Sequence, residues 1–453
     1  APRTRDAAAE LRGETVTAAL TPWARERRRP RVVIVGGGFG GLYASRALKR
    51  DDVEVLLLDR TNHHLFQPLL YQVATATLAP TDITAPIRWL LRKQANASVL
   101  MAEVTHIDPE RHVVATADGH EHAYDYLIVA AGARHAYFNH PEWESLAPGL
   151  KSIDDAIELR RRILTAFERA ESLDDAEERA AWLTFVVVGG GPTGTELAGM
   201  LPTIARHALD HDFRRIDPKS ARVILVEGGP KILPAYPDEL SEHARRDLTN
   251  LGVDVRTGTL VSEIGPHHVV AGGDRIHAHT ILWAAGNAAS PLGGDLGVAR
   301  DRSGRVQVEL DLSVPGRREI FVIGDLAATT TDGKPVPGVA PAAMQMGALA
   351  AKNIRRDLEQ RERVPFRYRN KGDLATIGRY RAIADFGRLR VTGSLAWWFW
   401  LFLHIMYLAG FRNRISVLVE WAYSYFTYQR GARLITGGRA VPASDRPPIP
   451  GKW

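Results

Sequence analysis

The sequence predicts an α/β fold with two Rossmann-like domains, the second inserted in the first, followed by a C-terminal membrane-associating helical region. Three observations lead to this prediction. Two glycine-rich turns about 150 residues apart each follow an apolar segment and precede a helical one. Apolar strand segments recur after each turn, and the C-terminal part combines aromatic and arginine side chains. The glycine pattern is that of a dinucleotide-binding turn, so each domain is expected to hold one nucleotide.

The first glycine-rich turn spans residues 36–41 and follows a short apolar strand segment. Gly36 permits a tight turn out of the strand, Gly38 has no Cβ to obstruct an approaching pyrophosphate, and Gly41 lets the following helix pack close to the sheet. The N-terminus of that helix then faces the phosphates. The next apolar segment ends on Asp59, whose carboxylate can accept hydrogen bonds from ribose hydroxyls.

The second turn, residues 189–194, repeats this order of strand, turn, helix, strand and acid. Its second strand is expected at residues 222–227 and ends on Glu227, later than usual because residues 207–220 lengthen the crossover. A glutamate here would repel a 2′-phosphate and bind a free 2′-hydroxyl, which favours NADH over NADPH. The alternative for the whole pattern is a duplicated structural unit that binds one nucleotide or none, and two complete copies argue against it.

Further apolar segments close each domain. Residues 126–133 and 280–286 are matching segments of strand followed by glycine, one after each turn, and they resemble the return strands of nucleotide domains. Residues 320–325 form another apolar strand that ends in Gly-Asp. By itself Gly-Asp is only a turn signal, but its position after the second unit indicates that the chain returns there to the first domain.

The composition narrows the classes of protein. A chain of 453 residues suggests two or three domains. The net charge of +6 is unevenly spread, because residues 361–453 hold 16 Lys and Arg against 5 Asp and Glu. The chain has no cysteine, which excludes disulfides and every mechanism that works through a thiolate.

The N-terminal residues are rich in Ala, Arg and Glu and contain no apolar stretch like that of a signal peptide, so export is not expected. Arg27, Arg28 and Arg29 lack interleaved aromatic residues, which favours a solvated tail over a nucleic-acid contact. His63 and His64 are adjacent and have no third ligand motif, so no metal site is expected.

Two aromatic segments near the C-terminus indicate contact with a membrane. Residues 395–411 contain one strongly polar side chain, His404, and would form a helix of roughly 25 Å, short of the roughly 30 Å hydrocarbon core. Arginines follow this segment and also the second one, residues 417–428. This pattern fits helices that lie in the interface and are attracted to anionic lipid. The alternatives are an oligomer interface or a buried helix pair.

The ordered set of features resembles the type II NADH:quinone oxidoreductases. The set comprises both glycine turns, residues 62–74, the Gly324-Asp325 pair, residues 338–345 and the aromatic C-terminus. The resemblance implies FAD in the first domain and NADH in the second, with a membrane quinone, either ubiquinone or menaquinone, approaching the flavin. The absence of cysteine separates the chain from disulfide reductases and sulfide-quinone reductases within the same superfamily.

The resemblance carries over residue by residue. The expected FAD contacts are Gly36, Gly38, Phe39, Gly40, Gly41, Asp59, Arg60, Ala131, Gly132, Gly324 and Asp325. The expected NADH contacts are Gly189, Gly191, Pro192, Thr193, Gly194, Glu227 and Gly286. The expected quinone contacts are Ala340, Pro341, Met344, Gln345 and Met346.

Three residues are candidates for catalysis. Glu196 matches the family's glutamate near the flavin and nicotinamide, and its alternative is an acid in a first helical turn favoured by the dipole. In the family's quinone signature two glutamines are usual, but here proline replaces the first at Pro341, which leaves Gln345 as the main hydrogen-bond donor to a quinone carbonyl. Lys371 falls where the family has a lysine near the quinone, and its alternative is a surface lysine.

These features together predict the domain organisation of the chain. It consists of a flexible N-terminal arm (1–30), an FAD-binding domain in two parts (31–182 and 291–360), an NADH-binding domain (183–290) and a membrane-anchoring region (361–453). We expect two-electron transfer from NADH through FAD to quinone without proton pumping, by a peripheral (monotopic) protein on the cytoplasmic face of the cell membrane. The alternatives are a soluble NADH-dependent reductase of a protein such as a ferredoxin, and a non-enzymatic flavin-bound redox sensor. The oligomeric state, a homodimer included, is left open.

Overall fold

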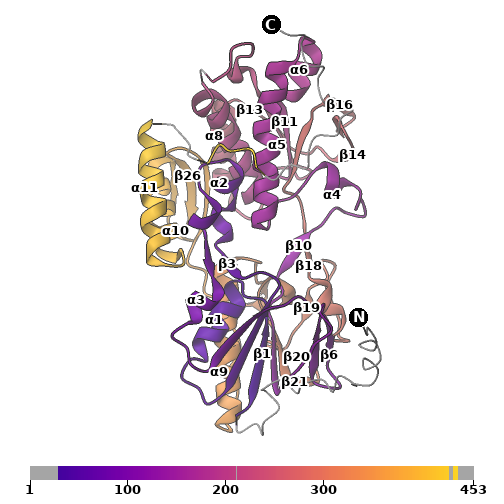
Figure 1. The fold of residues 1–453 in the computed structure, drawn as a ribbon, viewed down its shortest axis with the longest axis vertical. Helices are drawn as coiled ribbons and strands as arrows, with labels where there is room; N and C mark the ends of the chain where they lie inside the picture. Colours follow the sequence, from indigo (N-terminus) through magenta and orange to yellow (C-terminus); the bar gives the residue numbers. More distant parts are fainter. Residues whose placement is uncertain (1–28, 211, 428–431, 437–453) are drawn as a thin grey trace, which may run out of the picture.

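A computed structural model describes residues 29–210, 212–427 and 432–436. The predicted N-terminal arm lies outside the described residues apart from Arg29 and Pro30, and so does most of the chain after Thr427. Figure 1 shows two α/β bodies one above the other, with the C-terminal helices, in yellow, along one side.

The first body is built on a six-stranded sheet in the order β20-β21-β9-β1-β2-β5. Its strands are β1 (Arg31–Val35), β2 (Glu54–Asp59), β5 (Ala97–Met101), β9 (Tyr126–Val129), β20 (Ser313–Val314) and β21 (Arg317–Val322). β1 runs parallel to β2 and β9, and β21 runs parallel to β9 with Ile320 opposite Leu127. The chain therefore returns to this sheet after the second body is complete.

The second body repeats the arrangement with four parallel strands in the order β13-β12-β11-β17. These are β11 (Thr184–Val188), β12 (Arg222–Val226), β13 (Val253–Arg256) and β17 (Thr280–Trp283). The two bodies are joined by β10 (Ala133–His135) and β18 (Asn287–Ala289), which pair antiparallel between them (Figure 1).

The smaller strands form two- and three-stranded sheets outside the two main sheets. They are β3 (His63–Leu65), β4 (Thr84–Pro86), β6 (Val104–Asp108), β7 (Val113–Thr116), β8 (Glu121–Ala123), β14 (Val261–Gly265), β15 (His268–Ala271), β16 (Asp274–His277), β19 (Val306–Gln307), β22 (Ala327–Ala328), β23 (Thr330–Thr331), β24 (Lys334–Pro335), β25 (Asp373–Gly378), β26 (Arg381–Asp385) and β27 (Arg390–Thr392).

Helices cover the sheets and place the glycine turns. The helices before the C-terminal region are α1 (Phe39–Ala47), α2 (Leu70–Ala74), α3 (Ile87–Leu91), α4 (Trp143–Leu146), α5 (Ile153–Ser172), α6 (Ala176–Trp182), α7 (Pro192–Thr203), α8 (Asp238–Asn250) and α9 (Ala340–Leu358). α9 packs against α1, and a Cβ at Gly347 would lie 2.2 Å from the carbonyl oxygen of Gly40. Only glycine permits so close a crossing.

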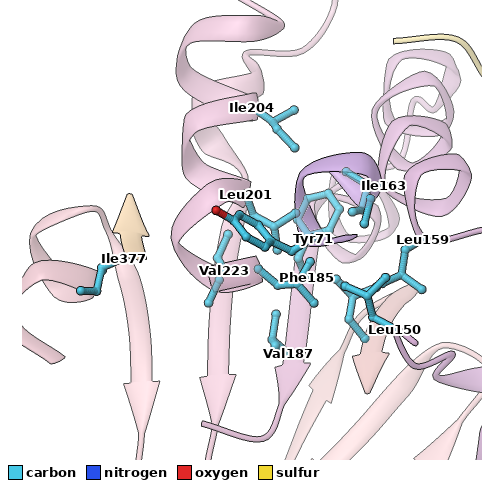
Figure 2. Close-up of a cluster of buried hydrophobic side chains, with 14 of the residues drawn as sticks. Tyr71, Leu150, Leu159, Ile163, Phe185, Val187, Leu201, Ile204, Val223 and Ile377 are labelled. Atoms are coloured by element: carbon cyan, nitrogen blue, oxygen red, sulfur yellow. The ribbon is translucent and has the colours of Figure 1, made fainter. Parts of the chain in front are cut away.

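One hydrophobic core connects the second body to the first body and to the C-terminal region. Figure 2 shows Tyr71 of α2 beside Leu201 of α7 and Phe185 of β11. The same cluster contains Ile377 of β25, and Trp400 and Trp421 from the C-terminal helices. The first body, the second body and the C-terminal region therefore share buried apolar surface, which fixes their positions relative to one another.

The C-terminal region consists of the sheet β25-β26-β27 and two helices, α10 (Gly393–Tyr407) and α11 (Phe411–Thr427). The apolar segment predicted at residues 395–411 thus forms one helix and a turn, in which Gly410 has a φ of +93°. Among the described residues, no helix is both long enough and apolar enough to cross a membrane.

Polar bonds attach α11 to the first body. Trp421 Nε1 donates to Gln72 Oε1 at 2.7 Å, and this pair is buried. Asn413 Nδ2 donates to the Thr84 carbonyl at 2.8 Å, and Ser416 Oγ donates to Asp82 Oδ1 at 2.7 Å. Residues 72–84 therefore contact α11 directly.

Candidate active site

Each glycine-rich turn links a central strand to a helix. A Cβ at Gly36, where φ is +100°, would lie 2.4 Å from the Ala130 carbonyl oxygen, and one at Gly41 would lie 1.8 Å from the Gly36 oxygen. Gly38 differs, because a Cβ there would meet no atom within 4 Å. The first and last glycines are thus required by packing, while the middle one opens onto free space where a pyrophosphate could lie.

The second turn has the same geometry. Gly189 has a φ of +106° and would clash with Ala284, and a Cβ at Gly194 would lie 1.8 Å from the Gly189 oxygen. A Cβ at Gly191 would again meet no atom within 4 Å. α1 begins at Phe39 and α7 at Pro192, directly after the open glycine in each case. Both helix N-termini therefore lie beside a free space suited to a phosphate.

The acids that end β2 and β12 bond to their own turns. Asp59 Oδ2 accepts from the Gly37 amide at 2.6 Å, and Oδ1 accepts from the Thr61 amide at 2.7 Å. Glu227 Oε2 accepts from the Gly190 amide at 2.6 Å, and Oε1 from the Gly229 amide at 2.6 Å. The two carboxylates therefore hold the two turns in the same way, and each retains lone pairs for a ribose hydroxyl.

Asp325 and Lys151 form a second polar feature in the first body. Asp325 is largely buried, and burial raises the pKa of its carboxyl, against the nearby charge of Lys151. Burial likewise lowers the pKa of the Lys151 ammonium. Within the described part of the chain, neither charged group makes a hydrogen bond or ion pair. Two half-buried groups of opposite charge that lack bonding partners indicate a site for a polar ligand.

These features fit FAD in the first body. The open space at Gly38 suits the pyrophosphate, Asp59 suits the adenosine ribose, and the unpartnered Asp325 suits a ribityl hydroxyl. Arg60 is exposed beside Asp59. Lys151 did not figure in the sequence prediction, because nothing in the local sequence marks a lysine just before α5 as close to residue 325.

The three predicted catalytic residues all reach one stretch of chain, residues 369–376. Gln345 of α9 bonds to the Arg369 backbone, with Nε2 donating to the carbonyl at 3.1 Å and Oε1 accepting from the amide at 3.0 Å. Lys371 lies in this stretch, and its Nζ donates to Tyr407 Oη of α10 at 3.3 Å. Glu196 of α7 interacts with the Thr376 backbone amide. We call residues 369–376 the connecting segment.

Glu196 is the most perturbed of the three. Burial raises the pKa of its carboxyl well above the ordinary value of 4.5, although the Thr376 amide partly opposes this shift. α7 and β25 meet closely, since a Cβ at Gly199 would lie 1.7 Å from the Ile377 carbonyl oxygen. The raised pKa therefore favours the protonated form of Glu196 at this tight junction. Glu196 also lies beyond the first turn of α7, so the helix-dipole alternative does not apply.

Gln345 positions the connecting segment, a role that the sequence did not predict. Its amide oxygen and one of its N–H groups form hydrogen bonds with the Arg369 backbone, and these bonds hold the connecting segment against α9. One N–H remains for another acceptor. Met346 is buried, with its sulfur accepting from the Gly324 amide at 3.1 Å, and Met344 is also buried. Direct contact of Gln345, Ala340, Pro341, Met344 and Met346 with a quinone stays a prediction.

Aromatic side chains connect the first glycine turn to the C-terminal helices. Phe39, the first residue of α1, contacts Phe66 edge-on at 5.8 Å between ring centroids. Phe66 contacts His404 of α10 edge-on at 6.1 Å, and His404 stacks on Trp400 at 4.3 Å. The sequence prediction gave no role to Phe66 or His404, because their proximity depends on residues more than 300 positions apart.

The outer sides of α10 and α11 expose a group of large apolar residues, here called the apolar face. Its members are Leu395, Trp398, Phe402, Met406, Ile415, Leu418, Val419 and Tyr423. Apart from the adjacent pair Leu418 and Val419, successive members on the same helix are three or four residues apart, which places them along one side of each helix, while Trp400 and Trp421 are buried in the core. An exposed apolar surface of this kind marks a site of contact with lipid or protein.

Two nucleotide sites beside a common core define a pyridine-nucleotide-dependent oxidoreductase. Residues 30–347 match the pyridine nucleotide-disulphide oxidoreductase family, and residues 370–428 match the NDH2 C-terminal domain. The chain is 46% identical over 434 residues to the type II NADH:quinone oxidoreductase Ndh of Mycobacterium tuberculosis, covering 92% of this chain and 93% of that one. It is 31% identical to the type II NADH:quinone oxidoreductase of Haemophilus influenzae, covering 85% and 95%.

The fold is also that of a solved NDH2 structure. The structure of NDH2 from Plasmodium falciparum in complex with NADH superposes with a TM-score of 0.82 at 20% identity, covering 90% of this chain and all of that one. The chain belongs to the type II NADH:quinone oxidoreductases. This confirms the predicted family, fold class, enzyme class and use of FAD and NADH, and no comparison favours the alternatives.

Proposed function

We propose that this chain passes two electrons from NADH through FAD to a membrane quinone without pumping protons. The observation that carries the proposal is the convergence of both nucleotide domains and the C-terminal helices on the connecting segment, through Glu196, Gln345 and Lys371. FAD, when bound, supplies the redox chemistry, because it accepts hydride from NADH and gives electrons to quinone.

The second body would hold NADH. Glu227 suits a free 2′-hydroxyl and opposes a 2′-phosphate, and the open space at Gly191 suits the pyrophosphate. The first body would hold FAD through the equivalent residues, with Asp325 and Lys151 as additional polar contacts. The pairing of β10 with β18 keeps the two nucleotide sites at a fixed separation.

Glu196 would keep a proton inside the site. Its raised pKa favours the protonated form, in which the carboxyl can donate a hydrogen bond, and the carboxyl would lose its proton when a neighbouring charge changes. Tyr236 lies near Glu196, and burial likewise raises its pKa, which keeps that hydroxyl protonated. A buried, neutral surrounding of this kind also excludes water from the reaction.

The acceptor side would face the membrane. The apolar face of α10 and α11 supplies buried contact with lipid, and Arg412 and Arg414 at the start of α11 supply attraction to anionic headgroups. A quinone that left the bilayer there would meet Tyr407, Lys371 and the connecting segment. The domain boundaries predicted from the sequence remain part of this proposal. We place the nucleotide sites on the cytoplasmic side, where NADH is supplied.

Steady-state kinetics test the proposal against its nearest competitor. NADH oxidation by the purified, FAD-loaded protein should be much faster with a short-chain quinone than with oxygen alone. A protein acceptor such as a ferredoxin should give no faster turnover than oxygen does. A rate with quinone equal to the rate with oxygen would rule the proposal out.

A further inference from the structure

His404 has a fixed tautomer. Its Nδ1 lies 2.7 Å from the Trp400 carbonyl oxygen, one helical turn earlier in α10. A carbonyl oxygen can only accept, so Nδ1 must carry the ring proton. Burial lowers the pKa of the imidazole to about 4, so the ring is neutral near neutral pH. Nε2 is therefore an unprotonated acceptor, and no described residue donates to it.

The surroundings of His404 place it between the apolar face and the first glycine turn. On one side it stacks on Trp400, which belongs to the core, and on another it meets Phe66, which contacts Phe39 at the start of α1. Tyr407 lies three residues later on the same side of α10 and accepts from Lys371 of the connecting segment. His404 thus lies among the residues that a quinone would pass between the bilayer and the flavin.

We propose that His404 Nε2 accepts a hydrogen bond from a hydroxyl of the reduced quinone and so favours the hydroquinone over the quinone at the acceptor site. This inference rests on the proposed quinone-reducing function. An oxidised quinone ring presents carbonyl oxygens, which only accept, whereas a hydroquinone presents O–H donors. A neutral acceptor nitrogen can therefore form a hydrogen bond with the hydroquinone and not with the oxidised quinone. His404 would therefore discriminate between the two redox states of one molecule.

The discrimination has a specific kinetic consequence. The hydroquinone should inhibit the enzyme as a product, and its inhibition constant should depend on Nε2, whereas the KM for the oxidised quinone should not. A single neutral hydrogen bond corresponds to roughly two- to tenfold in affinity. The probe is a short-chain ubiquinone analogue and its hydroquinone, used with the FAD-loaded protein under anaerobic conditions.

Two substitutions separate hydrogen bonding from shape. His404→Phe keeps a flat ring against Trp400 and Phe66 but removes the acceptor, so the hydroquinone inhibition constant should rise by roughly two- to tenfold while the quinone KM stays unchanged. His404→Gln keeps an acceptor oxygen, so its inhibition constant should stay within about twofold of the parent. His120→Gln, at an exposed turn beside Asp118, is the matched control and should change neither constant.

Each outcome is decisive. A parallel rise of both constants in His404→Phe would mean that His404 only shapes the pocket, and equal effects of His404→Phe and His404→Gln would also reject a role for Nε2. Unchanged constants in His404→Phe reject the inference outright. If His404→Phe loses FAD or melts early, His404→Leu takes its place. Absence of quinone turnover in the unsubstituted protein would instead defeat the proposed function itself.

Discussion

Asp59 and Gly37 are joined by a 2.6 Å hydrogen bond from the backbone amide of the glycine turn to a carboxylate oxygen. Glu227 and Gly190 repeat this bond in the second body at the same distance. The acid at the end of the second strand therefore supports the turn as well as offering an acceptor to ribose. Removing it should weaken nucleotide binding in two ways, by loss of the sugar contact and by loosening of the turn.

The Glu227→Arg variant tests the nucleotide preference of the second site. The glutamate carboxylate repels a 2′-phosphate, whereas an arginine guanidinium attracts one. The nucleotide preference of the variant should therefore shift toward NADPH. Loss of charged hydrogen bonds should lower kcat/KM with NADH by roughly 10- to 100-fold. Glu239→Arg, the same change at an exposed position of α8, is the control. Unchanged selectivity would show that Glu227 does not contact the ribose.

The Asp325→Ala variant tests the FAD site. The Asp325 carboxylate has no bonding partner among the described residues, so its proposed partner is the cofactor. Its removal should raise the FAD dissociation constant roughly tenfold or more, measured by fluorescence titration of the apoprotein. Asp274→Ala, at an exposed position of β16, should leave FAD affinity unchanged. Full FAD retention in Asp325→Ala would place the ribityl contact elsewhere.

The pH dependence of stability tests the state of Glu196. Its folded-state pKa is raised above 4.5, so the native state binds the proton more tightly than the unfolded chain does. Stability from this group is fully present below the unfolded pKa and is lost as the pH rises through the folded pKa. Glu196→Gln removes this loss, so its melting temperature should exceed that of the parent at about pH 8 and approach it at about pH 5. A pH-independent difference would contradict a buried, protonated Glu196.

The apolar face is tested by the paired substitution Trp398→Glu and Phe402→Glu. Both side chains are exposed on α10, so the fold and the bound FAD should be retained. Cosedimentation with vesicles that contain anionic lipid should be lost, because charges would replace buried apolar area. Leu260→Glu, at an exposed apolar residue of the second body, is the control. If the double variant still pellets and light scattering instead reports loss of a dimer, the face is an oligomer interface.

Features that depend on residues close together in the chain could be predicted from the sequence. The glycine turns, the acids at Asp59 and Glu227 and the return of the chain at Gly324 all lie within short, ordered motifs. The relation of Lys151 to Asp325 and that of Phe66 to His404 were not predictable, because packing brings these residues together across more than 170 positions. The amide of Gln345 was predicted to donate to a quinone carbonyl, and its bonds to the backbone of Arg369 were not predicted, because that contact depends on the path of the connecting segment.

Reduction and reoxidation of the bound flavin test the central claim most directly. Under anaerobic conditions, NADH should bleach the flavin absorbance of the purified protein, and addition of a short-chain quinone should restore it within one turnover. The rate of reoxidation should match the steady-state rate or exceed it. A flavin that NADH reduces but that no quinone reoxidises would contradict the account.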